Sequence, residues 1–149
     1  MSRILSLVLC TLSIPAAILG IDHVAKAETA RAFAGTFHLS NIIETGNSVD
    51  VTVTLVLHNP GTSDVRNGTV IVMDTQPQHS VLGSFATIKS LPHSGEVTVS
   101  QTFTISAAEY ARWKTGHDPL LDLLVPNGEG TSIEGIQAYR TTKLGEDVN

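Results

Sequence analysis

Hydrophobic and polar residues alternate along two long stretches of the chain. Between residues 49 and 58 the odd positions are all apolar and the even positions are mostly polar, and residues 96–105 follow the same rhythm. A period of two is typical of a β-strand with one buried face and one exposed face. The exposed face of the second stretch carries threonine and serine, which suit a half-exposed strand.

Five shorter segments also fit strands, at residues 35–40, 68–74, 81–89, 120–125 and 133–142. Clusters of proline, glycine, asparagine and aspartate separate these runs and indicate turns. The segment 120–125 is almost continuously apolar, which predicts a central strand covered on both faces. Seven strands joined without helical crossovers predict an all-β, antiparallel sandwich of two layers.

One short helix is expected at about residues 107–115. Ser106 and Glu109 form a capping box, and Gly116 is a natural stop. Tyr110 and Trp113 are three positions apart, so they share one side of this helix. Two interpretations stay open: both rings fill one end of the sandwich, or they form a surface contact with a partner or ligand.

Residues 1–27 resemble a secretory signal peptide. Arg3 supplies the positive charge near the start of the segment, and an apolar stretch follows. Ala25-Lys26-Ala27 then has the small residues that a signal peptidase requires. We expect cleavage after Ala27, which leaves 28–149 as a single exported domain in the periplasm or outside the cell. The alternative is a retained membrane anchor, because the segment approaches the length of a bilayer span.

Turn chemistry between the strands resembles that of bacterial immunoglobulin-like modules of the CARDB and fibronectin type III kind. The residues that carry this resemblance are Val53-Thr-Leu-Val-Leu-His-Asn-Pro-Gly, Asp64-Val65, and Leu91-Pro-His-Ser-Gly-Glu leading into Val97-Thr-Val-Ser-Gln-Thr-Phe. The resemblance covers about residues 50–106. It implies a seven-stranded antiparallel immunoglobulin-like sandwich, and it brings no catalytic residues with it.

The net charge and the reactive residues argue against several classes of function. A net charge of −5 argues against nucleic acid, whose phosphates require clustered lysine and arginine. The sole cysteine, Cys10, lies in the signal segment, so the mature chain has no thiol for catalysis or metal binding. We find no nucleophile motif and no phosphate-binding loop, and we expect no cofactor and no enzymatic activity.

Histidines and acids remain as candidates for binding. If each strand spans the sandwich, the loops alternate between its two ends, which gathers Asp74, His79, His117 and Asp118 at one end. The same reasoning places Asp64 and His93 at the other end. Imidazole and carboxylate groups are ligands that zinc prefers, although loop residues of these types are usually solvated.

The sequence favours a bacterial, exported, non-enzymatic protein that acts through its surface in interaction, adhesion or envelope structure, with another protein or an envelope component as partner. Sheet edges are the natural docking sites of such a module. The alternative is a periplasmic protein that binds a small ligand or a metal at the loop end around His79, His117 and Trp113. After signal cleavage, no stable membrane span is expected.

Overall fold

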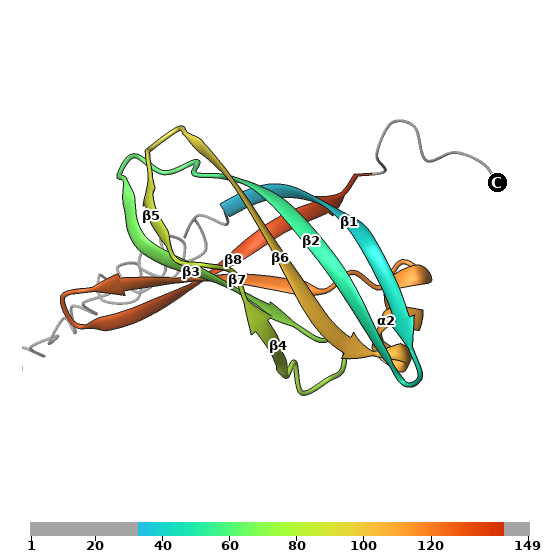
Figure 1. Cartoon of the computed structure of the whole chain (residues 1–149). Coiled ribbons are helices and arrows are strands. Elements are labelled where there is room, and N and C mark those ends of the chain that lie inside the picture. Colours follow the sequence, from blue (N-terminus) through green and yellow to red (C-terminus); the bar gives the residue numbers. More distant parts are fainter. Residues whose placement is uncertain (1–32, 142–149) are drawn as a thin grey trace, which may run out of the picture. The chain divides into compact units, whose positions relative to one another are not determined.

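The computed structural model describes residues 33–141 and shows a mostly β structure with one helix (Figure 1). The all-β class expected from the sequence is confirmed. The elements are β1 (Phe33–Thr45), β2 (Ser48–His58), β3 (Val65–Met73), β4 (Val81–Ser84), β5 (Ile88–Leu91), β6 (Glu96–Ser106), α2 (Ala107–Lys114), β7 (Leu120–Asn127) and β8 (Gly130–Arg140).

The predicted signal peptide lies outside the described residues. Within those residues, no helix has the length and hydrophobicity to cross a bilayer.

Within residues 33–141 the structure has eight strands instead of the predicted seven, because the expected strand at 81–89 is interrupted. Both β4 and β5 pair antiparallel with β3, with Ile71 opposite Ser84 and Gly68 opposite Ile88. Between them Phe85 turns into the core and is only 2% exposed, while its backbone N–H still donates to Val70 O at 2.9 Å. Burying this aromatic ring breaks the regular ladder but keeps β4 and β5 along one partner strand.

The sheet is mixed, so the prediction of a purely antiparallel sheet is wrong. The strand order is β4-β3-β7-β8-β1-β2-β6, and β1 runs parallel to β8 with Phe33 opposite Ile136. This pairing joins the first and last strands of the domain. Every other pairing of the described strands is antiparallel.

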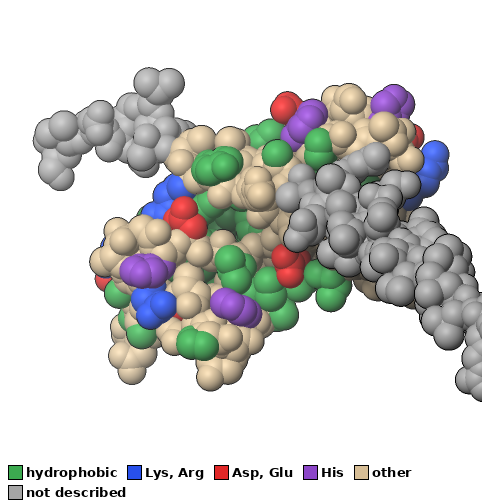
Figure 2. Space-filling view, turned by 180° about the vertical axis from the view of Figure 1, so that it is seen from behind, with side chains coloured by type: hydrophobic (Ala, Val, Ile, Leu, Met, Phe, Trp, Pro, Cys, Tyr) green, Lys and Arg blue, Asp and Glu red, His purple; other side chains and the backbone are tan. Residues whose placement is uncertain are grey.

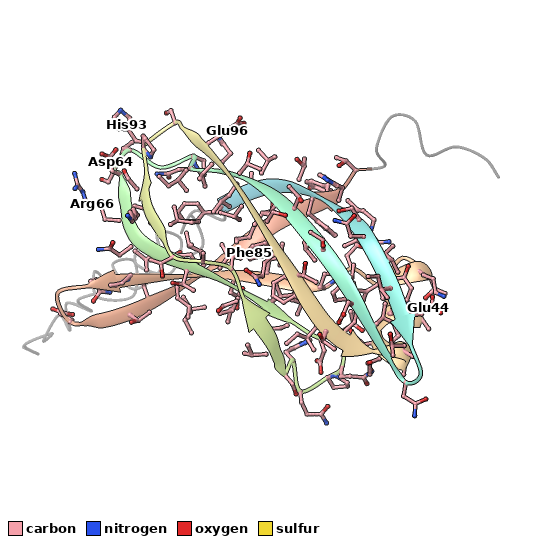
Figure 3. All side chains as sticks on the ribbon, viewed as in Figure 1. Glu44, Asp64, Arg66, Phe85, His93 and Glu96 are labelled. Atoms are coloured by element: carbon pink, nitrogen blue, oxygen red, sulfur yellow. The ribbon has the colours of Figure 1, made fainter. Side chains whose placement is uncertain are left out.

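The sheet curls until its two end strands approach each other. A Cβ added at Gly83 of β4 would lie 2.9 Å from the Phe103 ring of β6. The rings of Phe85 and Phe103 meet edge to face with centroids 5.3 Å apart, and Figure 3 shows Phe85 in the interior between these strands. The sheet is therefore nearly closed, with aromatic side chains filling the seam where no ladder forms.

The alternation seen in the sequence sets the core. Residues Val49, Val51, Val53, Leu55 and Leu57 of β2 are all buried. On β6, the predicted inward residues divide: Phe103 and Ile105 are buried, whereas Val97 and Val99 are only partly buried. This difference follows from position, because β2 has a neighbour on each side and β6 ends the sheet.

The predicted helix is confirmed as α2, with Ser106 as its N-cap. The Ser106 hydroxyl accepts a hydrogen bond from the Glu109 N–H at 3.1 Å. The second half of the expected capping box is replaced, because the Glu109 carboxylate bonds to other groups. Gly116, with a φ of +90°, follows the helix and permits the left-handed turn that ends it.

Candidate functional site

Of the four residues considered for a metal site, Asp74 and His79 lie in contact, with His79 Nδ1 3.5 Å from the Asp74 backbone oxygen. Asp74 organises its own loop, since its carboxylate accepts from the backbone N–H groups of Gln76 and Ser80, each at 3.1 Å. The His117 ring lies 3.2 Å from the Thr115 hydroxyl, and Asp118 forms an ion pair with Arg140. Within residues 33–141 no three His, Asp or Glu side chains converge as metal ligands would.

A buried carboxylate holds the helix to the β3–β4 loop. Oε1 of Glu109 accepts from Trp113 Nε1 and from the Thr75 N–H, each at 2.8 Å, and Oε2 accepts from the Thr75 hydroxyl. Arg112 adds a donor to the Thr75 carbonyl oxygen at 3.0 Å. Burial of a carboxylate is tolerated when its oxygens are satisfied in this way. The sequence predicted that Glu109 caps the helix. Its bonds to Thr75 were not predicted, because Thr75 lies in a loop distant in the chain.

The two aromatic residues of α2 belong to the core, not to a surface contact. Trp113 is fully buried at 0% exposure, and Tyr110 is buried with the Lys114 ammonium 4.9 Å from its ring centre. Burial raises the pKa of the Tyr110 hydroxyl. The surface-contact prediction for Tyr110 and Trp113 is corrected accordingly, because these rings fill the end of the sheet next to Glu109.

At the opposite loops, the sequence correctly brings Asp64 and His93 together. Asp64 Oδ1 lies 3.0 Å from both the backbone N and the Nδ1 of His93, as the labelled side chains in Figure 3 show. The hydrogen bond from the His93 backbone is the main cause that lowers the Asp64 carboxyl pKa. Nearby, the buried Asn59 amide donates to the carbonyl oxygens of Ser63 and Leu91. These contacts fix the turns at this end of the domain.

A groove opens on another face, where β7 and β8 come apart. Their ladder runs from Asn127–Gly130 only as far as Asp122–Gly135. Beyond that point β8 continues along β1, while the start of β7 continues along β3. The Asp118–Arg140 ion pair joins the two sides again past the separation. The β7–β8 ladder therefore closes one end of the groove, and the Asp118–Arg140 ion pair lies near its other end.

The groove is large enough for a ligand and mostly apolar. It measures about 760 Å³ and is lined by residues 118–122, residues 135–139, Met73 and His79. Leu120 is 42% exposed and Tyr139 is 70% exposed at its rim. Figure 2 shows this side of the domain, with apolar side chains gathered around a hollow. Binding pockets for small molecules have volumes of roughly 300–1,000 Å³.

Two of the sequence candidates, His79 and Asp118, line this groove, and Asp74, His117, Tyr110 and Trp113 do not. The apolar segment 120–125 was expected to be covered on both faces, but only one face is buried, through Leu121 and Leu123. No local signal in the sequence marks this opening, since Pro126 of β7 is itself paired with Thr131 of β8.

No family model and no curated protein matches this chain. Its structure is similar to part of a GH20 exo-β-N-acetylglucosaminidase from Vibrio harveyi, with a TM-score of 0.44 and 9% identity over 76% of this chain. The chain spans only 19% of that enzyme. A protein from Archaeoglobus fulgidus is similar at a TM-score of 0.33 and 8% identity, over 64% of this chain and 88% of its own. These remote likenesses do not indicate what this chain binds.

Proposed function

We propose that this chain is an exported, non-enzymatic interaction module, and that its β7–β8 groove holds an extended apolar segment of a partner protein. The groove is the observation that carries this proposal. It combines exposed apolar side chains with a stretch of β8 that has no neighbour on one side among the described strands. Contiguous apolar surface that stays exposed in a folded domain often marks a site of interaction.

An immunoglobulin-like arrangement is part of this proposal, and the strand order supports it. One layer contains β1, β2 and β6, and the other contains β3, β7 and β8, with β1 and β8 in parallel contact. These correspond to the A-B-E and C-F-G strands of an immunoglobulin-like domain. The position of β5 departs from that arrangement, because β5 pairs with β3 and not with β6.

The backbone of β8 favours an extended occupant. From Ile136 to Arg140 this strand pairs with β1, and consecutive residues of a strand direct their N–H and C=O groups to opposite sides. Some of these groups therefore face the groove, where the ladder with β7 has ended. Residues 118–122 line one side of the groove, and a strand rises about 3.3 Å per residue, so the groove suits an extended occupant of roughly four residues.

The polar side chains of the groove favour binding over catalysis. Asp118 is already paired with Arg140, and Asp122 lines the groove where the β7–β8 ladder ends. The Asp64–His93 pair is a hydrogen-bonded histidine and carboxylate of the kind that activates nucleophiles, but neither residue lines the groove. Hence the groove offers shape and apolar contact, with His79, Asp122 and Gln137 as polar groups for orientation.

Selection from a library of short random peptides displayed on phage tests this function. We expect peptides with apolar residues at alternate positions, since such residues point to one side of an extended chain. Leu120→Arg should weaken their binding roughly tenfold or more, because it places a charge on the apolar rim. Ile43→Arg is the matched control, since Ile43 is 60% exposed on β1 and does not line the groove. Failure to select peptides, or equal losses in both variants, would contradict the proposal.

A small apolar ligand is the second candidate, and the volume of the groove favours it. The fluorescent dye 1-anilinonaphthalene-8-sulfonate is a suitable probe for this case. Dye binding that Leu120→Arg abolishes, in a protein for which no peptide is selected, would favour the small ligand. Displacement of the dye by a selected peptide would favour the extended segment.

A further inference from the structure

A second surface, independent of the groove, lies along the free edge of β6. This strand ends the sheet order and pairs with β2 in unbroken register from Ser48–Ser106 to His58–Glu96. On its other side, no ladder forms with any strand of residues 33–141. Near Phe103 the edge is approached by Gly83 of β4, so the open part is residues 96–102. Val97 and Val99, within this part, are only partly buried.

The β6 edge lacks the features that usually prevent strand pairing. Natural edge strands are shortened, bulged, or protected by lysine or proline. The opposite edge of this sheet has such features, because it is divided into two four-residue strands at Phe85 and carries Lys89. In contrast, β6 has eleven residues, no bulge, no lysine and no proline, and Glu96 at its start is its one charged residue.

We propose that β6 pairs antiparallel with β6 of a second copy of this chain, about a two-fold axis at Val99. In this register Thr98 lies opposite Ser100 of the other copy, and Val99 lies opposite Val99. A two-fold interface requires such self-complementarity, since each residue must suit the one that it meets. The two Glu96 carboxylates lie at opposite ends of the paired segment, where they do not face each other.

Side-chain chemistry on the outer face supports a partner with this same sequence. Within one chain, Ser100 already pairs with the Thr54 hydroxyl at 2.9 Å, and Thr102 pairs with the Thr52 hydroxyl at 2.8 Å. The pairing of Thr98 with Ser100 across the dimer extends this row of hydroxyl groups. Cross-strand pairs of threonine and serine stabilise sheets. On the inner face, the two Val99 side chains cover each other and complete their burial.

Sedimentation velocity of the purified protein over a range of concentrations tests the dimer. We expect a concentration-dependent dimer for the unmodified protein. The double variant Thr98→Lys with Ser100→Lys places lysines opposite lysines across the axis, and should raise the dimer dissociation constant roughly tenfold or more. Both positions are exposed, so the fold is retained. Ala34→Lys with Thr36→Lys is the control, since it adds the same charge at exposed positions of β1, which has neighbours on both sides.

A cross-link then tests the register. Val99→Cys, in a Cys10→Ser background, should form an intermolecular disulfide on mild oxidation, whereas Val56→Cys on β2 should not. A protein that stays monomeric at all concentrations would overturn the proposal. So would a dimer that survives the lysine variant, or a dimer in which Val99→Cys and Val56→Cys cross-link equally. Loss of peptide binding at the groove leaves this result unaffected, because β6 does not line the groove.

Discussion

The strand pairs β2–β6 and β7–β8 are both antiparallel, yet they differ in how far they stay together. β2 and β6 are paired along their whole length, and their outer face carries short hydroxyl contacts such as Thr104 to Asp50 at 2.6 Å. β7 and β8 separate beyond Asp122–Gly135, and apolar side chains line the opening. In this domain the continuous β2–β6 ladder carries a polar outer face. The interrupted β7–β8 ladder leaves apolar residues exposed in a groove.

The difference has a physical cause in the neighbours of each strand. β8 must follow β1 in parallel while β7 follows β3, and neighbouring strands of a sheet are rotated relative to one another. In a sheet that curls until its ends approach, both demands are met only if β7 and β8 diverge.

The largest effect is expected in the core beneath the two halves of β7. Leu123→Ala, in the paired half, should cost about 2–5 kcal/mol of unfolding free energy, because Leu123 is fully buried. Leu121→Ala should lie at the low end of that range, because Leu121 lines the groove and the space it leaves joins the opening. Urea unfolding followed by Trp113 fluorescence measures both. Equal losses would show that the groove is packed as tightly as the core.

The ion pair near the end of the groove should have a smaller effect. Arg140→Ala removes its pairing with Asp118 and its position over the Phe37 ring, and should cost about 1 kcal/mol at low salt. Added salt should reduce the difference from the unmodified protein. Lys114→Ala is the matched comparison, since Lys114 also lies over a ring, that of Tyr110, but its 3.9 Å contact with Glu44 is more exposed and should contribute less. A larger loss for Lys114→Ala would contradict this ranking.

The hydroxyl pairs of β2–β6 should contribute less again. A double-mutant cycle with Thr52→Val and Thr102→Val should give a coupling energy of about 0.2–1 kcal/mol, since their hydroxyls lie 2.8 Å apart. Chemical denaturation of the four proteins supplies this coupling energy. Zero coupling would mean that water replaces the hydroxyl contact without loss.

The smallest effect on stability is expected from a change of pH at the Asp64–His93 contact, which joins the loop after β2 to the loop before β6. The pKa of the Asp64 carboxyl lies below its usual value of 3.8 because His93 donates hydrogen bonds to it. Its contribution to stability is therefore present above pH 3.8 and is lost as the pH falls through the lower folded value. The unfolding midpoints of Asp64→Asn and the unmodified protein should converge on acidification. A constant difference would show that this ionisation is not linked to folding.

Much of the fold was predictable because its rules are local. The buried side of β2 follows from alternation, α2 follows from Ser106 and Gly116, and the position of Asp64 and His93 at the same end follows from the order of the loops. The groove was not predictable, since residues near 120 and near 137 come together only after β1 and β3 have taken their places. Of the four residues gathered at that end, the structure places His79 and Asp118 in the groove, and it sets the His117 ring against Thr115.

The sequence by itself determined which residues face inward along the strands and where the helix begins, because both depend on spacing and on short-range hydrogen bonds. The tertiary structure decided that β1 lies parallel to β8, that Glu109 bonds to the β3–β4 loop, and that β7 separates from β8. These depend on contacts between residues far apart in the chain, where the curl of the whole sheet selects the neighbours that each strand can keep.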